Sequence, residues 1–154
     1  NFIKAIKSLN LQTKLIANLR YTNSLEIPQN VSLITRKISY KKLKSYYNKA
    51  RLVVISLKKI NRITGQRALL EALSMGKAVI IAKTEALAST YQLKDGKHVV
   101  FYKQEDSLDL KNKIKFVYNN KKLISRLEKY SREFVETMPK NLFYKALRKH
   151  LLSL

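Results

Sequence analysis

Residues 56–81 read SLKKINRITGQRALLEALSMGKAVII, and this stretch decides the fold that we expect. A polar loop leads to Gly65, which begins a predicted helix that continues to Ser74. Gly76 stands where a helix often ends in a left-handed residue. The apolar run 78–82 that follows is typical of a parallel strand buried on both faces. A loop, a helix and a buried strand in this order indicate an α/β fold.

The rest of the chain continues this alternation of strands and helices. Further apolar runs of strand length cover residues 14–19, 31–35, 51–57 and 98–102. Helical spacing of apolar residues covers 2–9, 40–49 (with Ser39 as its cap), 85–91, 108–118, 121–137 and 141–152. This order predicts a Rossmann-like parallel sheet with right-handed crossovers and helices on both faces, followed by extra C-terminal helices. The 154 residues fit one domain, 1–154.

The start of the helix at Gly65 has the chemistry of a phosphate site. Free backbone N–H groups of Gly65, Gln66 and Arg67 would point out of the helix N-terminus, where the helix dipole favours an anion. Gly65 has no Cβ, which lets a phosphate approach closely, and Arg67 adds positive charge. Glu71 follows about one and a half turns later, where its carboxylate can accept hydrogen bonds from the vicinal hydroxyls of a ribose. On spacing alone, an ordinary amphipathic helix with Glu71 as an exposed charge stays open.

The charge of the chain is strongly positive. Thirty-two Lys and Arg against ten Asp and Glu give a net charge of +22, which first indicates nucleic acid as a partner. The lysines are spread over nearly every segment, and only Tyr40, Tyr46 and Tyr47 stand among them as an aromatic platform would. We therefore discount nucleic acid. Attraction to an anionic membrane surface fits the same charge, at about 1 kcal/mol for each well-placed Lys or Arg.

Several classes of site and location can be set aside. The chain has no cysteine, so disulfides and thiolate metal sites are excluded. His98 and His150 have no ligand partners at metal spacing, and we expect no metal site. No apolar run approaches the roughly 20 residues that cross a bilayer. We expect a cytoplasmic protein with peripheral association at the inner membrane face. Because the first residue is Asn1, we also expect a piece of a longer chain.

Phrases of this sequence resemble, in order, the signature of family 4 glycosyltransferases. LLEALSMGKAVI at residues 69–80 resembles the family phrase LLEAM-x-x-G-x-P-V-I. ISYKKLKSYYNKA at 38–50 resembles the helix (V/I)S-x-x-x-L-x-x-x-Y-x-x-A, and KDGKHVV at 94–100 resembles the turn and strand DG-x-(N)G-x-L-V. The likeness extends over residues 31–136, which is most of the chain.

This resemblance implies a GT-B architecture, in which two Rossmann-like domains enclose the active site and this chain is the donor-binding C-terminal half. It implies that Glu71 binds the ribose hydroxyls and that backbone groups of Gly65 and Gln66 meet the diphosphate. Thr35 and Arg36 would contact the base. The donor would be a nucleotide diphosphate sugar, with no metal or other cofactor. Such enzymes transfer a hexose to a glycan or lipid hydroxyl with retention of configuration, as in polysaccharide biosynthesis.

The sequence departs from the family pattern in ways that bear on activity. The family's second glutamate, eight positions before the one that matches Glu71, is Ile63 here and cannot hydrogen-bond to the donor sugar. Thr64 and Gln66 are then the candidates to orient the sugar. The acceptor domain and the family's first strand with its phosphate-binding Arg and Lys would precede Asn1, so we expect the isolated domain to be inactive. Two alternatives stay open: a non-catalytic basic module or degenerate GT-B domain, and a sugar-nucleotide epimerase-like enzyme.

Overall fold

The computed structural model describes residues 2–17, 26–59 and 64–138. Its helices are α1 (Phe2–Lys7), α2 (Tyr40–Lys49), α3 (Gln66–Ser74), α4 (Glu85–Thr90), α5 (Ser107–Asn119) and α6 (Lys121–Thr137). Its strands are β1 (Thr13–Ile16), β2 (Val31–Ile34), β3 (Val53–Ile55), β4 (Val79–Ala82) and β5 (Val100–Tyr102). The predicted order of elements is confirmed over these ranges. Ile63, residues 18–19 of the first predicted strand and the predicted helix 141–152 lie outside them.

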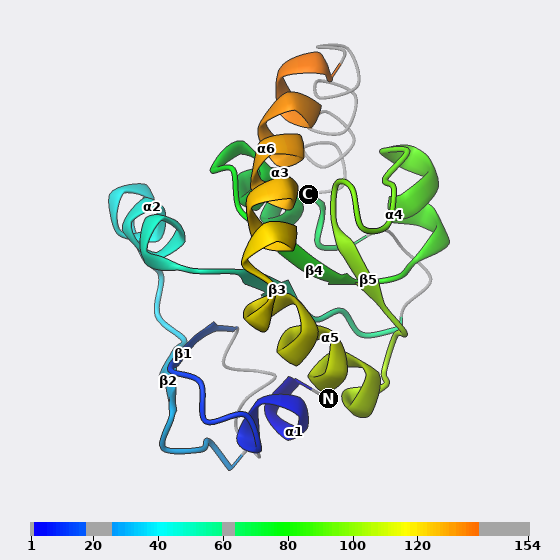
Figure 1. Ribbon diagram of the computed structural model, residues 1–154. Coiled ribbons are helices and arrows are strands. Elements are labelled where there is room, and N and C mark those ends of the chain that lie inside the picture. Colours follow the sequence, from blue (N-terminus) through cyan, green and yellow to red (C-terminus); the bar gives the residue numbers. More distant parts are fainter. Residues whose placement is uncertain (1, 18–25, 60–63, 139–154) are drawn as a thin grey trace.

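All the strands pair in parallel, but they form two sheets. β1 pairs with β2, and β4 lies between β3 and β5 in a separate three-stranded sheet. The sequence predicts a single sheet, so the division into two sheets differs from that prediction. The two sheets also differ in exposure: residues of β1 are alternately half-buried and exposed, whereas all four residues of β4 are buried. The class is confirmed as α/β, with parallel strands flanked by helices (Figure 1).

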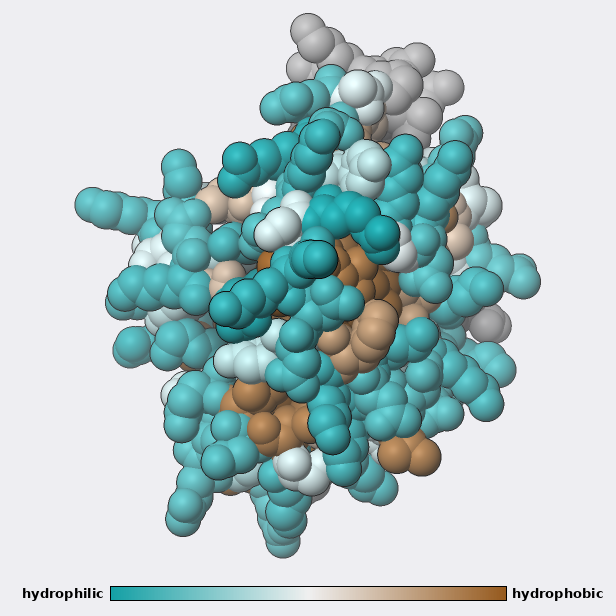
Figure 2. Space-filling view, viewed as in Figure 1, coloured by the Kyte–Doolittle hydropathy of each residue, from teal (hydrophilic) through white to brown (hydrophobic). Residues whose placement is uncertain are grey.

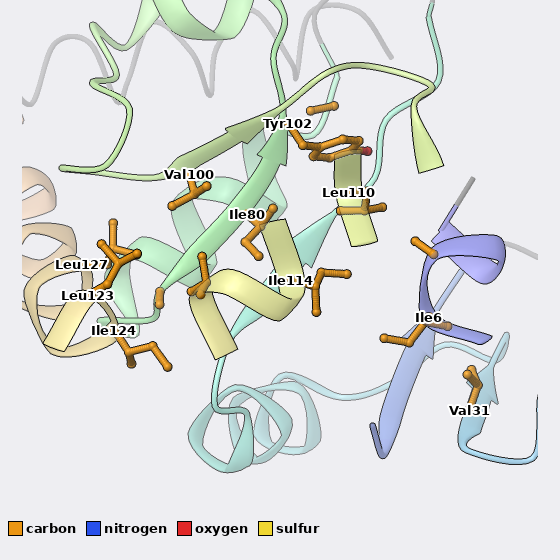
Figure 3. Close-up of a cluster of buried hydrophobic side chains, with 14 residues drawn as sticks. Ile6, Val31, Ile80, Val100, Tyr102, Leu110, Ile114, Leu123, Ile124 and Leu127 are labelled. Carbon is orange, nitrogen blue, oxygen red and sulfur yellow. The ribbon is translucent and has the colours of Figure 1, made fainter. Parts of the chain in front are cut away.

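The three-stranded sheet is covered on both faces, since alternate residues of a strand point to opposite sides. Ile80, Val100 and Tyr102 face one cluster of buried side chains, to which α1, α5 and α6 contribute (Figure 3). Val79 and Ile81 face a second cluster, which includes residues of α3 and α4. The continuous apolar run in β4 therefore has the cause that the sequence predicts, which is burial on both faces.

Helix α3 ends at a glycine in the left-handed conformation. Gly76 has a φ of +60°, and its N–H donates to the carbonyl oxygen of Leu73 at 2.8 Å. The N–H of Lys77 donates to the carbonyl oxygen of Ala72 at 3.0 Å. These two bonds make up the Schellman motif, which satisfies the last carbonyl groups of a helix. The prediction that Gly76 ends this helix is confirmed.

Lys77, the residue after Gly76, connects the end of α3 to two other helices. The Lys77 Nζ donates to the carbonyl oxygens of Asn48 and Ala50, at the C-terminal end of α2, at 3.2 and 3.1 Å. The carbonyl oxygen of Lys77 accepts a bond of 3.0 Å from the hydroxyl of Ser131 in α6, a fully buried polar side chain. The end of α3 is thus attached to both α2 and α6.

Gly76→Ala should lower the free energy of unfolding, and the strain of an L-residue in this conformation accounts for about 1–2 kcal/mol of the loss. The loss should be larger than the strain alone, since an added Cβ overlaps the Nε of Arg132. Gly96→Ala is the matched control: its φ is +67°, and no atom of the described residues lies within 4 Å of its Cβ position. Urea denaturation of both variants measures the difference. Equal losses would show that the Arg132 side chain moves aside at no cost.

Candidate functional site

The start of α3 lies at the end of β3, and Gly65 has a packing role there. Gly65 is the N-cap residue with a φ of +79°, and no side chain caps the helix. An added Cβ would lie 2.7 Å from the Leu57 Cδ2 and 3.4 Å from the Ile55 Cγ2. This corrects the interpretation that the absent Cβ makes room for a phosphate, because those two side chains occupy that side. The predicted contact between backbone N–H groups and a diphosphate stays a prediction.

Two side chains hold the carboxylate of Glu71. The Nε of Arg67, one turn earlier in α3, donates to the Glu71 Oε1 at 2.8 Å. The hydroxyl of Tyr47 in α2 donates to the Glu71 Oε2 at 3.3 Å. The Glu71 side chain is 26% exposed. Glu71 is therefore a half-buried group held between two helices, which differs from the exposed charge of the alternative interpretation.

The fixed carboxylate keeps room for further donors. An ionised carboxylate accepts at about four lone-pair positions on its two oxygens. Arg67 and Tyr47 use one position on each oxygen, and the described residues supply no third donor to Glu71. Each oxygen can therefore accept one more hydrogen bond, as two vicinal hydroxyls would require. This arrangement suits the ribose contact that the family resemblance implies, and that contact stays a prediction.

Arg67 continues the cluster toward an exposed aromatic ring. Its Nη2 donates to the hydroxyl of Tyr40 at 2.6 Å, and its guanidinium carbon lies 5.4 Å from the centre of the Tyr40 ring. The hydrogen bond and negative charge of Glu71 raise the pKa of Arg67. Sequence reasoning assigned the charge of Arg67 to a phosphate. In the structure Glu71 offsets part of that charge, and the phosphate contact is untested.

Sequence reasoning missed Tyr40 and Tyr47 as members of this cluster. The spacing in α2 placed Tyr47 inward, and the one available signal was that a buried tyrosine hydroxyl usually finds a partner. The partner Glu71 is 24 residues away in the sequence, so no local pattern identifies it. Burial, followed by the charge and hydrogen bond of Glu71, raises the pKa of Tyr47 well above its ordinary value.

Tyr47→Phe should flatten the loss of stability at high pH. The raised pKa means that the folded chain holds this proton more tightly than the unfolded chain, so the contribution is complete below the ordinary tyrosine pKa of about 10. It is lost as the pH rises above that value through the folded pKa. Urea titrations from pH 9 upward measure the slope, with Tyr46→Phe on the same helix as the reference variant. Parallel slopes for Tyr47→Phe and the unmodified chain would contradict this expectation.

The remaining predicted site residues divide into two groups. Thr64 and Gln66 flank Gly65 at the start of α3, in the same segment as Arg67 and Glu71. Thr35 and Arg36 follow β2, in the other sheet, with Thr35 half-buried and Arg36 exposed. A short segment connects them to α2, the helix that carries Tyr40 and Tyr47. No described hydrogen bond links Thr35 or Arg36 to the Glu71 cluster, so their contact with a base is untested.

Positive charge gathers at the carboxyl ends of the three-stranded sheet, where ligands of α/β proteins commonly bind. Lys83 and Lys103 directly follow β4 and β5, and Lys59 lies beyond the end of β3. With Lys113 of α5 they line a depression of about 490 Å³. Across the part of the chain that the structure describes, none of these four lysines forms an ion pair. Three carboxylates line the same depression and offset part of the lysine charge: those of Asp95, Glu105 and Asp109.

Within the described residues we find neither a cluster of metal ligands nor a helix that could span a membrane. They contain no group of three or more His, Cys, Asp or Glu side chains that could hold a metal. None of their helices has both the length and the apolar content of a membrane span. His98 packs against Phe134, with ring centres 4.7 Å apart, and burial lowers its pKa with help from Lys97 and Lys94. This contact gives His98 a packing role in the structure.

Comparisons with known proteins agree with this architecture. A family model described as "Glycosyl transferases group 1" matches residues 3–134. The C-terminal domain of a glycosyl transferase group 1 family protein (LpcC) from Francisella tularensis is 21% identical, with a TM-score of 0.60 over 71% of this chain and 54% of that one. A glycosyltransferase from Rickettsia africae is 16% identical, with a TM-score of 0.71 over 97% of this chain and 41% of that one.

A third similar structure was solved with a nucleotide sugar. Alr3699/HepE from Anabaena, in complex with UDP-glucose, is 14% identical, with a TM-score of 0.73 over 99% of this chain and 44% of that one. The chain spans about half the length, 41% to 54%, of these three structures. Comparison with curated protein sequences found no significant match. At these identities the structural likeness establishes the fold.

Proposed function

Because the chain belongs to the group 1 family of glycosyl transferases, we propose that it is the donor-binding half of a GT-B enzyme. In this proposal the domain holds a nucleotide diphosphate sugar. A second domain binds the acceptor, a hydroxyl group of a glycan or lipid, and transfer takes place between the two. The similar Anabaena structure in complex with UDP-glucose supports this class of donor. The family 4 resemblance extends the proposal to hexosyl transfer with retention of configuration.

The observation that carries the proposal is the hydrogen bonding of the Glu71 carboxylate. Its carboxylate is fixed by Arg67 and Tyr47, and one acceptor position on each oxygen is left for a ligand. Carboxylates that bind vicinal hydroxyls in two places gain specificity as well as affinity, since charged acceptors make the stronger hydrogen bonds. Glu71 would therefore orient the ribose and, through it, the rest of the nucleotide.

The diphosphate needs positive charge as it becomes the leaving group. In the proposal, backbone N–H groups at the start of α3 and the lysines beyond the strand ends supply it, without a metal or other cofactor. Fixed positive groups stabilise the charge that develops on the departing phosphate. Thr64 and Gln66 would orient the donor sugar in place of the glutamate that Ile63 replaces.

Nucleotide titration tests this function on the 154-residue chain. We expect saturation-transfer NMR and calorimetry to show that one of UDP, GDP and ADP binds, and that its monophosphate binds more weakly because it lacks the terminal phosphate. A series of salt concentrations with duplex and single-stranded DNA is the control. Loss of DNA binding with salt together with no response to any nucleotide would contradict the proposal and favour a basic binding module.

A further inference from the structure

Helix α5 and the start of α6 present exposed apolar side chains, one of which lies among lysines. We define the α5 surface as Leu108, Lys115, Phe116, Lys121 and Lys122. Leu108 is 64% exposed and Phe116 is 58% exposed. Phe116 and the three lysines line one shallow depression of about 710 Å³, together with three asparagines and no acidic residue. Leu108 lies outside this depression, in the first turn of α5 between Asp106 and Asp109.

The two apolar residues of the α5 surface are not part of the hydrophobic core. α5 already buries Leu110, Ile114 and Val117 against the sheet and its neighbours. Leu108 and Phe116 stay in water, although side chains of this size gain from removal of their apolar area. Figure 2 shows one face of the molecule, on which separate apolar patches are bordered by hydrophilic side chains.

The charge of the α5 surface has no internal counterpart. Among residues 2–17, 26–59 and 64–138, no carboxylate forms an ion pair with Lys115, Lys121 or Lys122. The chain as a whole carries +22. A partner that complements this surface must therefore be anionic and must also accept apolar side chains.

We propose that the α5 surface docks on an anionic lipid bilayer, with Phe116 and Leu108 entering the headgroup region and the lysines meeting lipid phosphates. Interfacial binding of this kind combines buried apolar area with attraction to anionic lipids. Nucleic acid fits less well, because single strands need successive aromatic rings for stacking and this surface has only Phe116. A phosphate backbone also offers no apolar surface against which the Leu108 side chain could be buried. The proposal does not depend on nucleotide binding.

Tryptophan fluorescence tests the insertion directly. The chain contains no tryptophan, so Phe116→Trp introduces a single one, whose emission is excited selectively at wavelengths that tyrosine does not absorb. Vesicles of phosphatidylcholine and phosphatidylglycerol in equal parts should shift its emission to shorter wavelength, whereas vesicles of phosphatidylcholine alone should not. Tyr40→Trp is the control, because Tyr40 is 73% exposed and lies outside the α5 surface. An unchanged emission of the Phe116→Trp variant, or an equal shift of the Tyr40→Trp variant, would overturn the proposal.

Matched charge variants test whether the lysines act locally. Lys115→Gln/Lys122→Gln and Lys41→Gln/Lys44→Gln each remove two exposed positive charges, the second pair from α2. A lysine near an anionic surface contributes about fivefold, so the first pair should lower vesicle affinity by roughly 30-fold and the second by much less. Equal losses would assign the binding to overall charge and overturn the proposal. Binding to single-stranded DNA with no vesicle binding would replace it with a nucleic-acid interface.

Discussion

Glu71→Ala should weaken the binding of a nucleoside diphosphate by about 1.5–3 kcal/mol, or roughly 10- to 150-fold in Kd. The reason is the loss of charge-assisted hydrogen bonds from the ribose hydroxyls to a carboxylate that Arg67 and Tyr47 already hold in place. Calorimetry with whichever diphosphate binds the unmodified chain measures the change. Urea denaturation of the same variant separates a local loss from a loss of folded protein.

A second ligand makes this test specific for the ribose. If Glu71 accepts from both hydroxyls, Glu71→Ala should weaken the ribonucleotide more than its 2′-deoxy analogue, which lacks one donor. Glu71→Ala also frees the Arg67 guanidinium, whose charge would then favour a phosphate and oppose the loss. The Glu71→Ala/Arg67→Ala variant removes that effect. Equal affinity of the Glu71→Ala/Arg67→Ala variant and an Arg67→Ala variant would exclude Glu71 from the site.

Ile80→Ala and Ile81→Ala should each lower the free energy of unfolding by about 2–5 kcal/mol, the cost of a cavity in a packed core. Both side chains are fully buried, but they face opposite clusters because they are neighbours in β4. Losses of this size are a large fraction of the 5–15 kcal/mol (roughly) that stabilises a typical domain. Urea denaturation of each variant measures the loss.

Ile16→Ala is the matched control for these two variants. Ile16 is the same residue type at the end of β1, but it is 45% exposed, and its replacement should cost under about 1 kcal/mol. If Ile80→Ala were costly and Ile81→Ala were not, the sheet would be covered on only one face. The helices packed on the other face would then contribute little to the stability of the folded chain.

Local patterns predicted the central part of this fold closely. The sequence placed a helix up to Ser74 and a strand over 78–82, and the structure has α3 ending at Ser74 and β4 at Val79–Ala82. Gly76 and the continuous apolar run are local signals, because left-handed caps and two-sided burial each restrict which residues fit. Such signals need no knowledge of distant segments.

The contacts that define the candidate site were harder to predict because they are distant in sequence. Glu71 was singled out from its helix, but Tyr47, which holds it, lies on another helix. The side chains that fill the space beside Gly65 come from the end of β3, and the spacing of the helix does not reveal them. The division into two sheets also depends on hydrogen bonds between strands, which apolar runs do not specify.

The attachment of Lys77 to α2 and of Ser131 to Lys77 has a consequence for ligand recognition. Because the end of α3 is fastened to both neighbouring helices, α2 cannot slide along α3 without breaking the bonds to Asn48 and Ala50. These bonds favour the position of Tyr47 beside Glu71, where its hydroxyl donates to the carboxylate. A ligand bound as we propose would meet an acceptor that is already held by two side chains, which lowers the conformational entropy to be lost on association.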